Sequence, residues 1–211
     1  EVITGQATIA MELFRQCAQA PDYLFICIGG GGLAAGMALV ARYLQPRIKL
    51  IGVEAEESAS MKAAFEAGEP VTLEKVGHFA EGVAVRRTGS LTYAICRDLL
   101  DEIITVDTDQ ICAAIRDIFE DTRSIVEPAG GLTVAAAKKY GAGNRLKGKT
   151  LVTISCGANV NFDRLGHVAR RLARGERPNV LVLLMDTLRA DRFGSYGNPN
   201  DLTPRMDEVA A

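Results

Sequence analysis

Four consecutive glycines, Gly29, Gly30, Gly31 and Gly32, lie between an apolar run at residues 23–28 and a second apolar segment at residues 33–44. The first run has the length and composition of a buried β-strand, and the second those of an α-helix. A helix N-terminus carries unpaired N–H groups and a partial positive charge, and glycine leaves both open to an anion. The run lacks the spacing of a dinucleotide-binding motif and of a P-loop. We therefore expect a compact phosphate as the ligand; the alternative is a tight turn that binds nothing.

The glycine loop belongs to a longer alternation of strands and helices. A strand at residues 23–28, a helix at 33–44 and a strand at 48–53 predict a βαβ unit, which is parallel and right-handed. Thr4 and Thr108 are the predicted N-caps of two further helices. The alternation predicts an α/β domain with a parallel sheet between two helical layers. Beyond the βαβ unit, further strands are expected at residues 103–106 and 151–154, and further helices at 4–18, 58–67, 91–100, 111–119, 128–140 and 163–174.

The charge balance and the cysteines limit the class of protein. The chain has 24 Lys and Arg against 26 Asp and Glu, a net charge of −2, so nothing indicates a nucleic-acid or membrane partner. No apolar run approaches the ~20 residues of a membrane span. The five cysteines form no C-x-x-C pair, and most lie in apolar segments. We expect a reduced, cytoplasmic protein.

Several segments together resemble one known family. They read "FICIGGGGLAAG" (residues 25–36), "VGHFAEGVAVRR" (76–87), "SIVEPAGG" (124–131) and "ISCGANVNF" (154–162). The chain from residue 1 to about residue 175 is similar to the biosynthetic threonine dehydratases, or threonine deaminases, which are pyridoxal-phosphate-dependent lyases. The resemblance implies the parallel-sheet large domain of fold type II, the tryptophan synthase β-like kind, here expected to be incomplete. It also implies a small amino acid as the substrate and pyridoxal 5'-phosphate as the cofactor.

The same resemblance assigns roles to individual residues. A serine of the family faces the cofactor's pyridine nitrogen, and Cys156 stands at that position here. The thiol is a weaker hydrogen-bond partner than a hydroxyl; alternatively, Cys156 is a core thiol at a strand end. Glu127 and residues 80–83 line the same cavity in the family, although Glu127 equally fits a first-turn carboxylate that the helix dipole favours. The cofactor phosphate is bound by the backbone amides of Gly29, Gly30, Gly31, Gly32 and Leu33.

The family's catalytic lysine has no counterpart in this sequence. That lysine bonds covalently to the cofactor aldehyde and lies in a Ser-x-Lys-x-Arg-Gly motif, which is absent from the 211 residues. Lys75 is the nearest substitute, since its loop precedes residues 80–83. We expect the lysines to lie on solvated surfaces, so the chain alone is expected not to convert threonine to 2-oxobutyrate and ammonia. The lysines are Lys49, Lys62, Lys75, Lys138, Lys139, Lys147 and Lys149.

The last residues resemble a different family. Residues 177–211 are similar to the beginning of sulfatases, whose first strand delivers a metal-binding aspartate, here Asp186. A carboxylate at a strand end is a good ligand for a hard cation, although Asp186 also fits a simple turn cap. We divide the chain into a dehydratase-like domain at residues 1–175 and a dependent strand–loop–helix tail at 176–211. A metal-dependent ester hydrolase fragment and a non-catalytic phosphate-binding or assembly module are the alternative functions. We expect a homo-oligomer, because an incomplete core exposes apolar surface.

Overall fold

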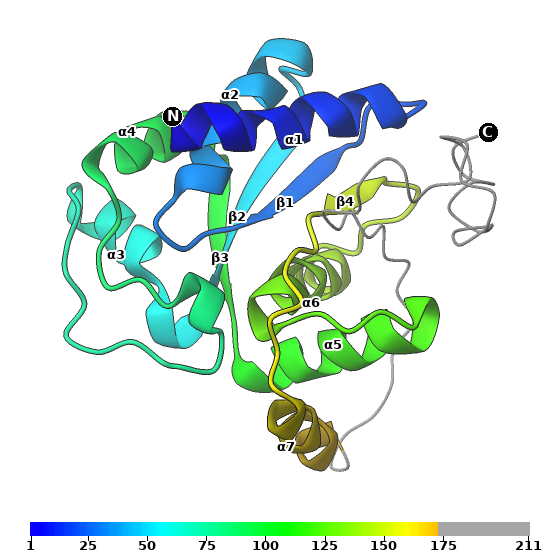
Figure 1. Cartoon of the computed structure of the whole chain (residues 1–211). Coiled ribbons are helices and arrows are strands. Elements are labelled where there is room, and N and C mark those ends of the chain that lie inside the picture. Colours follow the sequence, from blue (N-terminus) through cyan, green and yellow to red (C-terminus); the bar gives the residue numbers. More distant parts are fainter. Residues whose placement is uncertain (173–211) are drawn as a thin grey trace.

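A parallel sheet lies at the centre of the computed structural model, which describes residues 1–172 (Figure 1). Its four strands in this part of the chain follow the order β3-β2-β1-β4. Phe25 of β1 pairs with Ile51 of β2 and with Thr153 of β4. This arrangement confirms the parallel α/β prediction. The strands are β1 (Tyr23–Cys27), β2 (Lys49–Ala55), β3 (Glu102–Val106) and β4 (Leu151–Thr153).

Four helices form one layer, and alternate residues of β1 anchor it. Leu24, Ile26 and Ile28 are fully buried in the hydrophobic cluster that these helices share with the sheet. At the α1–α2 contact, a Cβ on Gly36 would lie 2.4 Å from the carbonyl oxygen of Ile3, so the two helices approach closely only with glycine there. The helices of this layer are α1 (Val2–Gln16), α2 (Gly32–Leu44), α3 (Ser60–Ala67) and α4 (Ser90–Leu99).

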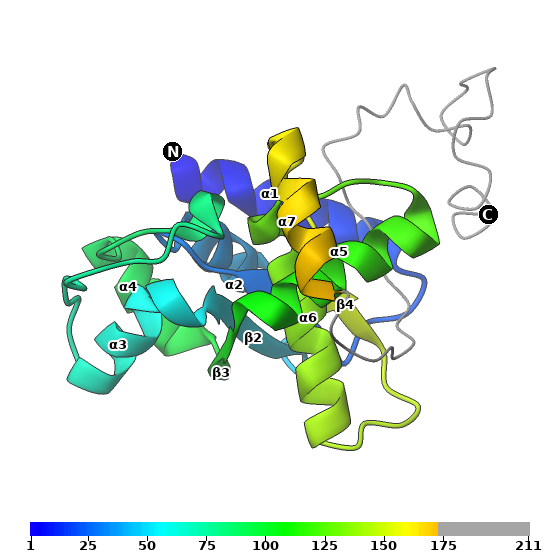
Figure 2. The same ribbon diagram turned by 90° about the horizontal axis from the view of Figure 1, so that it is seen from below.

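The opposite face of the sheet carries the second helical layer. The intervening residues of β1, Phe25 and Cys27, point into its cluster, as the two-residue period of a strand requires. Figure 1 and Figure 2 both place α5 and α6 away from α3 and α4. The two separate clusters confirm the three-layer prediction. This layer consists of α5 (Thr108–Thr122), α6 (Pro128–Gly143) and α7 (Phe162–Leu172).

The two predicted helix caps are wrong. Thr108 is the first residue of α5, and the cap is Asp107, whose carboxylate accepts from the amide of Gln110 at 2.8 Å. The Gln110 side chain in turn accepts from the Asp107 amide, which completes a capping box. Thr4 lies inside α1, which begins at Val2 and has Glu1 as its N-cap. Ile3, in the first turn of this helix, packs against the core.

Residues 68–89 form the long irregular connection that the sequence predicts. One short 3-10 turn, η2 (Glu81–Val83), interrupts this connection. No helix within residues 1–172 combines the length and the apolar character needed to cross a bilayer. The predicted tail, the end of the last helix and Asp186 lie outside the described residues.

Candidate phosphate and cofactor site

The glycine loop joins the end of β1 to the beginning of α2. Gly31 is the N-cap of α2 and has a φ of +90°, a conformation that favours glycine. A Cβ on Gly31 would lie 2.7 Å from Cε of Met61 and 2.9 Å from Cβ of Thr92. The Thr92 hydroxyl donates to the Gly30 carbonyl at 2.7 Å. Packing against α3 and α4 therefore holds the loop in one conformation.

The loop presents open hydrogen-bond donors. The first backbone hydrogen bond at the start of α2 runs from the Ala35 amide to the Gly31 carbonyl at 2.9 Å. Among the hydrogen bonds of the described residues, none is donated by an amide of residues 29–33. A Cβ on Gly30 would meet nothing within 4 Å, so space is open beside the loop. Unpaired amides at a helix N-terminus, with no side chain in the way, fit a phosphate group.

The turn η2 lies directly against this loop. A Cβ on Gly29 would come within 3.2 Å of Cα of Val83 and 3.5 Å of the carbonyl oxygen of Gly82. Arg164 of α7 donates to the Phe79 carbonyl at 2.8 Å, which secures the segment just before the turn. The structure thus brings residues 80–83 to the glycine loop, where the family resemblance placed them.

Glu127 faces the same region. It is the N-cap of α6, yet its side chain makes no capping hydrogen bond. A Cβ on Gly82 would lie 2.8 Å from Oε1 of Glu127, and one on Gly157 would lie 2.4 Å from it. Burial raises the pKa of this carboxyl, while a hydrogen bond from the Asn159 backbone lowers it. The Glu127 carboxylate is therefore turned toward residues 82 and 157 and away from its own helix.

Cys156 follows the end of β4 and lies beside β1. It is half-buried and packs against both hydrophobic clusters. Its neighbour Ser155 is buried and donates to the Gly130 carbonyl at 2.9 Å, which fixes this segment on α6. A hydrogen bond with Cys156, together with burial, holds the pKa of the Cys27 thiol well above its ordinary value. Sequence reasoning missed Cys27 as a neighbour of Cys156.

The lysines differ in their surroundings, and one prediction about them is wrong. Lys138 is not solvated: its side chain is 13% exposed and pairs with the buried Asp117 of α5. The reason is that α6 packs on α5, so this position faces the contact between the two helices. Lys75, the nearest substitute for the catalytic lysine, is exposed in the long connection.

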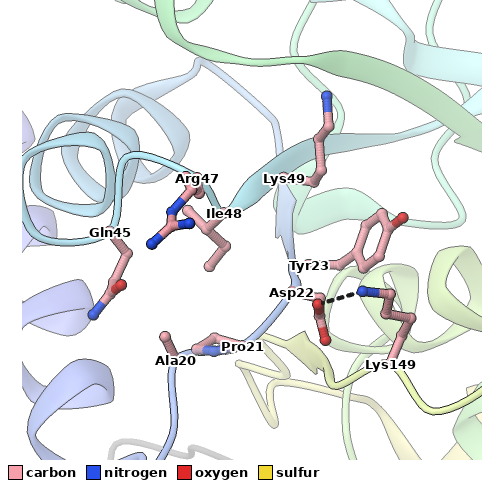
Figure 3. A pocket seen from close by; sticks show the side chains of 9 residues that line it. All are labelled: Ala20, Pro21, Asp22, Tyr23, Gln45, Arg47, Ile48, Lys49 and Lys149. Atoms are coloured by element: carbon pink, nitrogen blue, oxygen red, sulfur yellow. Dashed lines mark hydrogen bonds and ion pairs between the residues drawn. The ribbon is translucent and has the colours of Figure 1, made fainter.

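Two cavities of the described residues differ in size and position. A cavity of about 20 Å³ lies beside Glu127, between η2 and the segment after β4. A larger one, about 440 Å³, lies at the opposite end of the sheet, where β1 and β2 begin (Figure 3). There Asp22 pairs with Lys149 at 2.9 Å and also accepts from the Thr150 amide at 2.9 Å. Asp22 and Lys149, two of the four charged residues that line the larger cavity, thus bind each other.

Comparison with known proteins identifies the family. The sequence profile of the pyridoxal-phosphate dependent enzymes matches residues 1–157, well over half of the chain, and the chain therefore belongs to that family. Within it, the chain is similar to L-threonine dehydratase biosynthetic IlvA of Escherichia coli K12, at 52% identity over 181 residues. The match covers 86% of this chain and 35% of the relative. The Salmonella typhimurium protein of the same name is 51% identical over 181 residues, with the same coverage of both chains.

Solved structures agree with the sequence relatives. Threonine deaminase isoform 2 of Solanum lycopersicum superposes with a TM-score of 0.78 and 39% identity, over 80% of this chain and 49% of that one. Maize serine racemase gives a TM-score of 0.70 at 30% identity, over 81% of this chain and 54% of that one. These neighbours confirm the fold type II architecture and the resemblance to threonine dehydratase. The chain spans about a third of the length of the curated relatives it matches. None of these relatives is a sulfatase, so that resemblance stays a prediction.

Proposed function

We propose that this chain carries the phosphate-binding part of a pyridoxal-phosphate-dependent threonine dehydratase. The observation that carries the proposal is the row of amides at residues 29–33, which donate no hydrogen bond within residues 1–172, in a loop that packs against α3 and α4. The residues assigned to the phosphate are Gly29, Gly30, Gly31, Gly32 and Leu33.

The family resemblance assigns roles to the surrounding residues, and we carry these roles into the proposal. Bound pyridoxal phosphate supplies an electron sink for the negative charge that develops at the α-carbon of an amino acid. The amides and the dipole of α2 bind the phosphate anion. Cys156 offers a thiol to the pyridine nitrogen, a weaker hydrogen-bond partner than a hydroxyl. Glu127, whose pKa is raised by burial, holds a proton beside the cleft at higher pH than an exposed carboxyl would.

The substrate proposal rests on the relatives. L-threonine gives 2-oxobutyrate and ammonia in a dehydratase, and the most similar curated proteins named here are threonine dehydratases. A serine racemase is among the structural neighbours, so serine is the competing substrate. Because the 211 residues lack the family's lysine motif, we expect this polypeptide to bind the cofactor without converting threonine.

The test uses one glycine that the fold does not need. Gly30→Val adds a side chain in open space, so the fold should persist while the branched side chain obstructs the phosphate. Gly143→Val is the matched control, since a Cβ there also meets nothing within 4 Å, at the far end of α6. Ligand at 100 times its dissociation constant stabilises a protein by about 2.7 kcal/mol.

We expect pyridoxal phosphate to raise the melting temperature of the unaltered chain. The control variant Gly143→Val, which keeps Gly30, should show the same rise. The Gly30→Val variant should show no rise. A melting temperature of the unaltered chain that pyridoxal phosphate does not move would overturn the proposal. An equal rise in Gly30→Val would do the same, because the loop would then not be the binding site.

Assembly and location stay predictions. Val2, Tyr43 and Leu91 are 69%, 87% and 66% exposed, and such apolar surface favours a homo-oligomer. Light scattering that shows a monomer would contradict this. The proposed location is the cytoplasm, although relatives from yeast and plants carry "mitochondrial" and "chloroplastic" in their names.

A further inference from the structure

Two cysteines that are far apart in the sequence meet at the end of two neighbouring strands. β1 and β4 are paired in parallel, with Phe25 opposite Thr153. The pairing extends one step further, because the Ile154 amide donates to the Phe25 carbonyl at 3.3 Å. Continued by one residue, this register sets Ser155 opposite Cys27, so Cys156 is the next residue along.

The two thiols are in contact. The Cys27 side chain is hydrogen-bonded to that of Cys156. Disulfides join residues whose Cα atoms are about 4.4–6.8 Å apart and whose Cβ atoms face each other. In a regular strand Cys156 would face away from Cys27, but β4 ends at Thr153. The hydrogen bond between the two side chains shows that the Cys156 thiol is turned toward Cys27.

The surroundings of the two cysteines differ in a way that orders their reactivity. Cys27 is 6% exposed at the end of β1, two residues before the glycine loop, whereas Cys156 is half-buried after the end of β4. A reagent from solution reaches Cys156 first, and the buried Cys27 lies behind it. This is the arrangement of an attacking thiol and a resolving thiol.

We propose that Cys27 and Cys156 form a reversible disulfide across the β1–β4 junction, close to the glycine loop in sequence at Cys27. The oxidant is a small-molecule disulfide. The Cys156 thiolate attacks one of its sulfurs, which breaks the reagent's S–S bond and releases one thiol. Cys27 then attacks Sγ of Cys156, which breaks the mixed disulfide and releases the second thiol. Two electrons pass to the reagent, and the two cysteine protons end on the released thiols.

The bond has a consequence that rests on the proposed function. Oxidised Cys156 has no S–H to offer to the cofactor ring, while the amides of residues 29–33 are untouched. Oxidation should therefore weaken the binding of pyridoxal phosphate and leave that of inorganic phosphate unchanged. The raised pKa of Cys27 makes the second step the slow one, because the thiolate is the nucleophile.

The test is peptide mapping of the folded 211-residue protein after treatment with oxidised glutathione, without reduction. We expect a cross-linked peptide pair that contains Cys27 and Cys156 and that dithiothreitol removes. Cys27→Ser should leave glutathione on Cys156, and Cys156→Ser should abolish the cross-link. Cys96→Ser is the matched control, since Cys96 is fully buried in the other layer and should change nothing.

The outcomes separate this proposal from the previous one. Persistent glutathione on Cys156 in the unaltered chain, or no modification of either cysteine, would overturn the disulfide. A cross-link that forms in a protein that binds no pyridoxal phosphate would support the disulfide and refute only the cofactor site. Because these readouts come from the unaltered chain, a variant that fails to fold does not affect them.

Discussion

Two helices of the first layer, α2 and α3, begin at the same end of the sheet. The backbone amides at their N-termini differ in whether they have hydrogen-bond partners. At α3 the buried Glu54 accepts from the amides of Met61 and Lys62, both at 2.8 Å. The first turn of α2 has no acidic residue, and the amides of residues 29–33 donate no hydrogen bond among the described residues. The N-terminus of α3 is therefore bound by the Glu54 carboxyl group, whereas the N-terminus of α2 has no such partner within residues 1–172. The difference favours the proposal that the amides at the N-terminus of α2 bind an anion that is not part of the described chain.

The large cavity at the other end of the sheet supports the same reasoning. Three of its four charged residues are paired: Lys149 with Asp22 (Figure 3), and Lys49 with Asp101, which does not line the cavity. The fourth, Arg47, forms no ion pair within residues 1–172. The glycine loop offers a row of amides that donate no hydrogen bond within residues 1–172, at a helix N-terminus where an anion is favoured. In the described part of the chain, the cavity of about 440 Å³ offers one unpaired cation, Arg47.

The largest expected effect comes from Gly31→Val. Its φ of +90° strains a β-branched residue, and the new Cβ would press on Met61 and Thr92. We expect a loss of about 3–5 kcal/mol in the free energy of unfolding, measured by urea titration. Gly30→Val is the control and should change stability by less than about 1 kcal/mol. Equal stabilities would show that the loop is not held in this conformation.

The pH dependence of the free energy of unfolding tests the contact of Glu54 with the N-terminus of α3. Burial raises the pKa of Glu54 from 4.5 to about 7, although the Met61 and Lys62 amides lower it. The folded pKa lies above the unfolded one, so the folded state binds more protons in this window, and stability falls as pH rises from 4.5 to 7. Over this pH range the free energy of unfolding should fall by about 3 kcal/mol.

The variant Glu54→Gln isolates that change. It cannot titrate, so its stability should be flat in this window once the background slope of other groups is subtracted. Chemical denaturation at a series of pH values measures both proteins. The same slope in both would mean that Glu54 does not carry the effect.

The smallest effect is expected at the large cavity. Asp22→Asn removes an ion pair with Lys149, whose side chain is 48% exposed. Exposed pairs contribute about 0–1 kcal/mol, so calorimetry should show a melting temperature close to that of the unaltered chain. Binding of inorganic phosphate should also be unchanged. Stronger phosphate binding in Asp22→Asn, which leaves Lys149 unpaired, would move the site to this cavity.

The sequence predicted what depends on neighbouring residues and missed what depends on register. The βαβ unit and the open N-terminus of α2 follow from residues close together in the chain, and both predictions agree with the structure. The contact of Cys27 with Cys156 arises only when β1 and β4 pair. Glu54 had one visible signal, a carboxylate directly after the apolar residues 50–53, but the amides that it binds lie in α3. The cap at Asp107 was missed because Thr108 beside it fits the same rule.

The measurement that tests the central claim most directly is an amide NMR titration of the 211-residue protein with inorganic phosphate. The claim is that the amides at the N-terminus of α2, which have no hydrogen-bond partner within residues 1–172, bind an anion. The amides of Met61 and Lys62 in α3, which are bound to Glu54, do not. We expect saturable shifts at the amides of residues 29–33, with Met61 and Lys62 unmoved. Saturable shifts at Met61 and Lys62, or at the residues of the large cavity in place of the loop, would contradict the claim, as would no saturable shift at all.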